Sequence, residues 1–203
     1  MIELPFHNDF FSLIEPDNKE EIVEHCLDPA LELPKEDFEW GDECLSEKVH
    51  LKLTGFTELL KPYITEVLNE IIDEGTPYGF TLDEVWKNTY RRYYHQEQHD
   101  HIGHELSFVI FMNDAQEDAS RLYFVNERSR VTSPLWGDLS GLMGDNFSIE
   151  ERKGDIIFFP SHMLHGVSPH RLDTPRTTIS GNISVGQIEK TLYSVNSIAK
   201  KGL

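Results

Sequence analysis

The sequence contains few of the features that would indicate a disulfide-rich or membrane-spanning protein. Its 203 residues include only two cysteines, Cys26 and Cys44, which do not form a CxxC pair. We therefore expect reduced thiols rather than a disulfide framework or a zinc site, and a cytoplasmic location. No apolar run approaches the roughly 20 residues that cross a bilayer, and the N-terminus lacks the basic and apolar regions of a signal peptide, so no membrane association is expected.

Basic residues are also scarce. The chain has 18 Lys and Arg against 36 Asp and Glu, which gives a formal net charge of −18. A field of this sign repels phosphate backbones, and no group of basic residues is dense enough to reverse it locally. We expect no nucleic-acid partner and attribute the acidity to solubility. A hydrophobic content of 38% is ordinary for a globular protein and sufficient for one core.

Two segments in the first third of the chain have helical patterns. In residues 18–27, "NKEEIVEHCL", apolar side chains fall on one face after Asn18, a suitable N-cap. In residues 59–75, "LLKPYITEVLNEIIDEG", adjacent apolar pairs recur every four residues, which is typical of a helix packed against a core. Gly75 is suited to end this second helix, and Pro62 is expected either to begin or to kink it.

From about residue 81 onward the sequence changes to short β-type runs separated by polar, turn-prone segments. The runs are "TYRRYY", "LSFVIFM", "RLYFV", "FSIEE", "DIIFF" and "TTISGNIS". Helices followed by many short strands favour the α+β class, with helices covering a closed or sandwiched β-structure. Because repeats and low-complexity linkers are absent, we expect one domain over residues 1–203.

Seven of the ten histidines fall into two clusters. Alternate residues of a strand point to the same side, so His99 and His101 can converge on one atom while Asp100 points away. His165, which follows a different strand-like run, is the candidate for a third ligand. Three ligands with open positions beside them are the geometry of a non-haem iron site. The other histidines of the two clusters have no comparable spacing.

The segment from Tyr90 to Arg176 resembles the iron(II)- and 2-oxoglutarate-dependent oxygenases, in particular their prolyl-4-hydroxylase-like branch. That family has a His-x-Asp/Glu motif, a distal histidine and a basic residue about ten positions later. Here "QEQHDH" occupies the place of the first motif, and "KGDIIFFPSHMLHGVSP" resembles the strand that leads to the distal histidine. "PRTTIS" then places Arg176 eleven residues after His165. The resemblance covers about half of the chain.

The resemblance implies a double-stranded β-helix (jelly roll) barrel with an N-terminal helical layer. On this basis residues 1–80 would form a mainly helical covering layer, 81–190 the jelly-roll core and 191–203 a C-terminal tail. Iron(II) would be the cofactor, and 2-oxoglutarate and dioxygen the co-substrates, in the hydroxylation of an unactivated C–H bond of a peptide or small molecule. The implied iron ligands are His99, His101 and His165. The implied 2-oxoglutarate-binding residues are Arg176, Thr178 and Tyr90, with the arginine fork matched to a carboxylate.

The sequence departs from the family pattern at one ligand. His101 stands where the family has a carboxylate, and Asp100 lies beside it, out of register. Either the site has three histidines, or a bulge turns Asp100 inward and His101 outward. The alternation of side chains along a strand favours the three-histidine site.

Two other classes of function remain open. A three-histidine cupin-type dioxygenase or isomerase would keep the barrel and the metal, but it has no need of a carboxylate anchor such as Arg176 with Thr178. A catalytically silent jelly-roll binding protein would keep only the fold, and the intact ligand spacing argues against it. No residue in the sequence identifies the primary substrate, because fold and cofactor are shared more widely than substrate.

Overall fold

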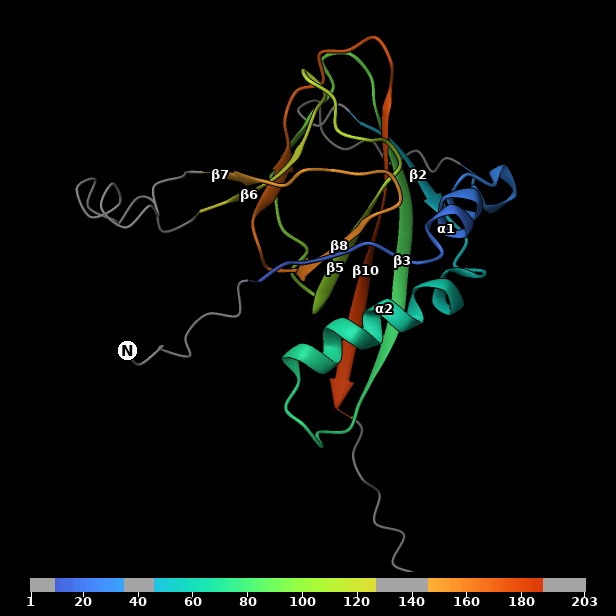
Figure 1. Ribbon diagram of the computed structural model, residues 1–203, viewed down its shortest axis with the longest axis vertical. Helices are drawn as coiled ribbons and strands as arrows, with labels where there is room; N and C mark the ends of the chain where they lie inside the picture. Colours follow the sequence, from blue (N-terminus) through green and yellow to red (C-terminus); the bar gives the residue numbers. More distant parts are fainter. Residues whose placement is uncertain (1–9, 35–45, 127–145, 188–203) are drawn as a thin grey trace, which may run out of the picture.

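The computed structural model describes residues 10–34, 46–126 and 146–187, so Cys44 and the expected tail at 191–203 lie outside the described residues. Two antiparallel sheets form the framework of this part of the chain (Figure 1). The larger sheet contains, in spatial order, β1 (Ser12–Ile14), β8 (Ile156–Pro160), β5 (Leu106–Phe111), β10 (Arg176–Gln187), β3 (Tyr78–Tyr90) and β2 (Glu47–Leu51). The smaller sheet contains β4 (Gln96–His99), β9 (His165–Val167), β6 (Leu122–Val125) and β7 (Asn146–Ser148).

The two faces of the larger sheet differ in character. On β10, Ile179 and Ile183 are fully buried in the hydrophobic cluster that also contains the apolar side of helix α2 (Phe56–Ile71). Figure 1 shows α2 lying across β10 and β3. The alternate residues of β10, among them Thr178 and Asn182, point to the opposite face and are buried although polar. This alternation places a polar surface inside the protein, where a site can form.

A second hydrophobic cluster joins the two sheets on that opposite face. It contains Phe111 of β5 and Phe159 of β8 from the larger sheet, and Leu122 and Phe124 of β6 from the smaller one. The two sheets therefore form a sandwich, with α2 on the outside of the larger sheet. Hydrogen bonds do not close the two sheets into one barrel in the described part of the chain, which corrects the expectation of a barrel.

The expected helices are present with different ends. Helix α1 (Lys19–Cys26) follows Asn18, whose side chain bonds the Tyr63 hydroxyl and Glu21 instead of capping the helix. Helix α2 begins before the expected segment, so Pro62 lies in its interior, and it ends before Gly75. None of the helices in the described ranges is both long and apolar enough to cross a membrane.

The N-terminal layer is less helical than expected. Besides α1, α2 and a single 3-10 turn at Pro29–Leu31, it contributes strands β1 and β2, which form the two edges of the larger sheet. Strand β2 is short, and only its last residue is buried, so its sequence lacks the apolar alternation that identifies a strand. The expectation of a mainly helical layer over residues 1–80 was therefore incomplete.

Candidate metal centre

Three histidines from two distant parts of the chain meet between the two sheets. One ring nitrogen from each of His99, His101 and His165 lies within 4.8 Å of the others. The ring centroids of His99 and His165 are 4.4 Å apart, and that of His101 is 5.1 Å from each of them. The structure thus brings together the three histidines that the sequence singled out.

The smaller sheet positions two of these histidines. His99 at the end of β4 and His165 at the start of β9 are direct partners across the two strands. The His165 ring packs edge-on against Phe159 of the larger sheet, with ring centroids 4.8 Å apart. His165 is 5% exposed, so this ligand candidate is held rigidly beside the apolar cluster between the sheets.

The larger sheet positions His101, which lies beyond the end of β4. Its ring stacks on Trp86 of β3, with centroids 5.5 Å apart and planes 14° apart. Its Nδ1 lies 2.8 Å from Oδ1 of Asn182 on β10. His99 and His101 therefore do not converge because of alternation along one strand. They converge because His101 contacts Trp86 and Asn182 of the larger sheet. Asp100 is exposed, and its Oδ1 accepts a hydrogen bond from the Ile102 backbone N–H at 3.2 Å.

Hydrogen bonds select the same tautomer for all three imidazoles. The Nδ1 atoms of His99, His101 and His165 face oxygen acceptors, namely the Glu97 carbonyl (2.7 Å), Asn182 Oδ1 (2.8 Å) and the Met163 carbonyl (2.8 Å), respectively. A carbonyl oxygen can only accept, so each Nδ1 carries the hydrogen and each Nε2 presents a lone pair. Such partners orient metal-ligating histidines and raise their basicity.

Burial keeps the three imidazoles neutral. Desolvation is the main cause that lowers the pKa of His165 to about 3 and the pKa of His101 to about 4, and it also lowers the pKa of His99. The neighbouring histidines contribute to the first two shifts, because one imidazolium disfavours another. Neutral imidazole is the form that binds metal, so the cluster is ready to ligate at neutral pH.

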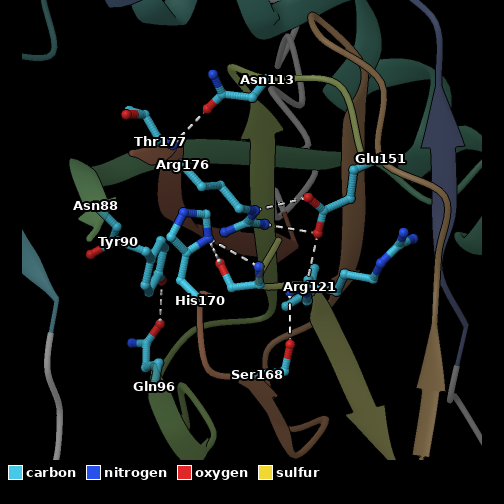
Figure 2. A network of polar contacts seen from close by, with 12 residues as sticks. Asn88, Tyr90, Gln96, Asn113, Arg121, Glu151, Ser168, His170, Arg176 and Thr177 are labelled. Atoms are coloured by element: carbon cyan, nitrogen blue, oxygen red, sulfur yellow. Dashed lines mark hydrogen bonds and ion pairs between the residues drawn. The ribbon is translucent and has the colours of Figure 1, made fainter. Parts of the chain in front are cut away.

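The candidate co-substrate anchor, Arg176, is held by a residue that the sequence analysis missed. Its Nε and Nη2 donate to Glu151 at 2.9 and 2.8 Å, and both side chains are almost fully buried (Figure 2). Arg176 Nη1 is buried and has no hydrogen-bond partner within the described ranges. Glu151 therefore occupies the Nε/Nη2 edge of the guanidinium and leaves Nη1 for another acceptor. Glu151 belongs to the run "FSIEE", which was expected to form a strand, and no sequence pattern singled it out.

Thr178 and Tyr90 lie next to Arg176 on the same inner face. Tyr90 is the partner of Arg176 across β3 and β10, and the guanidinium lies 5.2 Å from the centroid of its ring. Thr178 is buried opposite Asn88, whose side-chain oxygen is buried without a partner among the described residues. Arg176, Thr178 and Asn182 occupy alternate positions of β10 and therefore lie on the same face. Asn182 bonds His101, so this face extends from Arg176 to the histidine cluster.

This arrangement fits the groups that an iron- and 2-oxoglutarate-dependent enzyme must hold. Three neutral nitrogen donors with fixed tautomers suit iron(II). A buried cationic N–H without a partner, on Arg176, suits the far carboxylate of 2-oxoglutarate, since unpaired buried polar groups are destabilising. When bound, iron(II) and 2-oxoglutarate together activate dioxygen for oxidation of the substrate.

Comparison with known proteins agrees with this chemistry. A protein family described as "Putative 2OG-Fe(II) oxygenase" matches residues 84–182, just under half of the chain, and this stretch contains the three histidines and Arg176. No curated protein matches the sequence. The matched stretch is the part of the chain that holds the candidate site.

Solved structures show the same fold at low sequence identity. SnoN, a non-haem 2-oxoglutarate-dependent epimerase of nogalamycin biosynthesis solved with Fe3+, 2-oxoglutarate and nogalamycin RO, has a TM-score of 0.60 and 14% identity, over 96% of this chain and 88% of SnoN. EvdMO1 has a TM-score of 0.59 and 14% identity over 87% of this chain, which spans only 47% of EvdMO1. A collagen prolyl hydroxylase of Paramecium bursaria Chlorella virus-1 has a TM-score of 0.51 and 14% identity, over 87% of this chain and 96% of the viral enzyme.

Proposed function

We propose that this protein is a 2-oxoglutarate- and iron(II)-dependent oxygenase that holds iron(II) through the Nε2 atoms of His99, His101 and His165. The observation that supports the proposal best is the set of three Nδ1–H hydrogen bonds, which leaves one lone pair on each ring within a cluster 4.8 Å across. Three histidines that met only for packing would not need one shared tautomer. Asp100 is not part of this ligand set, because it is exposed and bonded to its own loop.

We further propose that 2-oxoglutarate lies along the inner face from the histidines to Arg176. Its far carboxylate accepts from the Nη1 edge of the guanidinium, and Thr178 adds a hydroxyl beside it. The charges of the proposed complex add up to zero. Three neutral imidazoles do not reduce the dipositive charge of iron(II), so the co-substrate dianion balances it, and Glu151 balances Arg176. A site with a carboxylate ligand would not need this second carboxylate at the arginine.

For the primary substrate, we propose a small molecule whose unactivated C–H bond is hydroxylated. Support comes from SnoN, which was solved with the small molecule nogalamycin RO. A peptide substrate and the prolyl-4-hydroxylase-like branch are supported less, by the lower TM-score of the viral collagen prolyl hydroxylase. We also propose a reducing compartment, with which the buried Cys26, which forms no disulfide among the described residues, is compatible.

One observation favours a second candidate, the three-histidine cupin-type metalloenzyme. The Arg176–Glu151 pair satisfies most of the guanidinium without any co-substrate, as an arginine with a purely structural role would be satisfied. The two candidates differ in whether 2-oxoglutarate binds next to the metal.

The test of the proposed function is an anaerobic titration of the purified protein with iron(II) and then with 2-oxoglutarate. We expect the charge-transfer absorption of an iron–oxo-acid complex, and succinate formation after oxygen is admitted. His165→Ala should lose both signals, whereas His104→Gln should keep them, since His104 lies outside the cluster and bonds Asp83. Metal binding without a 2-oxoglutarate signal would support the cupin-type alternative.

A further inference from the structure

Gln96 connects the proposed co-substrate pocket to one of the proposed metal ligands. A register shift in β4 between Gln96 and His99 interrupts the regular alternation, so that Gln96 pairs with Val167 and His99 with His165, two residues on one face of β9. The Gln96 amide lies between two groups on this inner face. Its Oε1 is 2.9 Å from the Tyr90 hydroxyl, and its Nε2 is 3.3 Å from Nε2 of His99 (Figure 2 shows the Tyr90 contact).

Hydrogen-bond logic fixes the orientation of this amide. His99 donates from Nδ1 to the Glu97 carbonyl, so its Nε2 can only accept. The amide must therefore turn its NH2 group toward His99 and its oxygen toward the Tyr90 hydroxyl, which donates. The Nε2 lone pair of His99 that accepts from Gln96 is the same lone pair that would bind a metal. One lone pair cannot serve both, so metal binding releases the amide N–H of Gln96.

We propose that the released amide N–H of Gln96 donates to the carboxylate of the 2-oxo acid that lies next to the metal. This inference rests on the function proposed above and adds a co-substrate-binding residue to it. A donor that loses its acceptor in a partly buried site needs a new one, and the oxygen ligands that arrive at the metal are the nearest source. Gln96 is thus bonded to His99 before the metal binds and to the co-substrate afterwards.

Tyr90 acts through Gln96 in this scheme. Its hydroxyl holds the amide oxygen, while its ring lies beside the Arg176 guanidinium, 5.2 Å from the centroid. Tyr90 therefore contacts both residues that would bind the co-substrate. Its ring lies beside Arg176, which would bind the far carboxylate, and its hydroxyl bonds Gln96, which would bind the carboxylate next to the metal. It is a positioning residue, since it orients Gln96 by donating to the amide oxygen.

The experiment compares Gln96→Leu, Gln96→Glu and a matched control, Gln98→Leu, an exposed glutamine of the same strand. Calorimetry with manganese(II) measures metal affinity, and a second titration of the metal-loaded protein measures 2-oxoglutarate affinity. Gln96→Leu should weaken 2-oxoglutarate binding about ten-fold or more, because a hydrogen bond to a charged group is lost. It should bind manganese(II) more tightly, by up to about ten-fold, because the competing bond to His99 is gone.

Gln96→Glu keeps the side-chain shape and replaces the donor by a carboxylate. We expect still tighter metal binding and weaker 2-oxoglutarate binding, and wild-type values for Gln98→Leu. Opposite changes in the two affinities are a signature that a purely structural role would not produce. Unchanged 2-oxoglutarate affinity, or a parallel loss of both affinities, would overturn the inference about Gln96. Wild-type protein that binds manganese(II) but not 2-oxoglutarate would instead overturn the proposed function.

Discussion

Glu151 and Arg176 form a two-pronged ion pair that is almost completely removed from water, with N–O distances of 2.8 and 2.9 Å. Oε1 of Glu151 also accepts from the Leu122 backbone N–H at 2.9 Å, so the carboxylate ties the smaller sheet to β10. A buried pair of this kind contributes little net stability, but removal of one partner leaves an uncompensated charge in a low-dielectric interior. The proposed co-substrate anchor is therefore also a structural element.

Arg176→Ala should lower the free energy of unfolding by about 3–5 kcal/mol, because Glu151 is left buried and unpaired. The measurement is equilibrium unfolding in urea, with the midpoint and slope compared with those of wild type. The control is Arg92→Ala, whose ion pair with Asp173 is exposed; it should change stability by less than about 1 kcal/mol. Equal small effects for both variants would show that the Arg176 pair is not desolvated.

The double variant Arg176→Met/Glu151→Gln should recover most of that lost stability, since no unpaired charge remains and Gln can still accept from Leu122. Its affinity for 2-oxoglutarate should stay at least thirty-fold below that of wild type, because truncation of a buried charge partner costs about 2 kcal/mol or more. Calorimetry on the manganese-loaded protein measures this. Wild-type affinity in a stable double variant would exclude Arg176 as the anchor.

Asn182→Leu should weaken metal binding about 10- to 100-fold, because His101 loses the acceptor that fixes its tautomer and ring orientation. Asn182→Asp keeps an acceptor at that place and should bind metal more tightly than the leucine variant. Ser184→Ala is the control, since Ser184 bonds Asp83 and does not contact the histidines. The idea fails if the leucine and aspartate variants bind metal equally well.

Metal affinity should begin to decrease at a lower pH than it would with exposed histidines as ligands, whose pKa is about 6.5. Protons compete with the metal near the pKa values of the metal-free histidines, and burial lowers the pKa of all three, to about 4 for His101 and to about 3 for His165. Competition calorimetry at several pH values measures this profile. A midpoint near 6.5, the value of exposed histidine, would show that the ligands are not the buried imidazoles.

The lowered pKa values of the histidines also make the stability of the metal-free protein depend on pH. The folded pKa values lie below that of the unfolded chain, near 6.5, so the unfolded state takes up protons first as the pH falls. Stability is fully present above pH 6.5 and decreases below it, by up to about 1.4 kcal/mol per pH unit for each histidine. The decrease ends only when the pH passes the folded values near 4 and 3. Thermal unfolding between pH 7 and 5 tests this, and variants at His165 should show a shallower decrease.

The sequence identified the histidines by their spacing, but for a partly incorrect reason. Strand alternation placed His99 and His101 on one side, whereas His101 in fact lies past the strand and is held by Asn182 and Trp86 of the other sheet. The contact with Asn182 joins residues 81 positions apart, and no local pattern in the sequence predicts it. His165 was easier to identify, since it follows a strand whose five residues are all buried.

The residues that the sequence did not reveal are those whose roles depend on tertiary contact. Glu151 was not singled out by any sequence pattern, yet it is buried in its pair with Arg176. Gln96 belongs to a strand too short to recognise, and only the register shift turns it inward. The helices were predictable because their apolar stripes are local, although the start of α2 was not.

The central claim is that three histidines, and not Asp100, hold the iron. The most direct measurement is anaerobic iron(II) binding, followed by the 2-oxoglutarate charge-transfer absorption, on wild type, His101→Ala and Asp100→Ala. Because a ring nitrogen of His101 lies in the cluster and Asp100 is exposed, we predict that His101→Ala loses both signals and that Asp100→Ala keeps both at wild-type affinity. Loss of iron binding in Asp100→Ala, with binding retained in His101→Ala, would contradict the account.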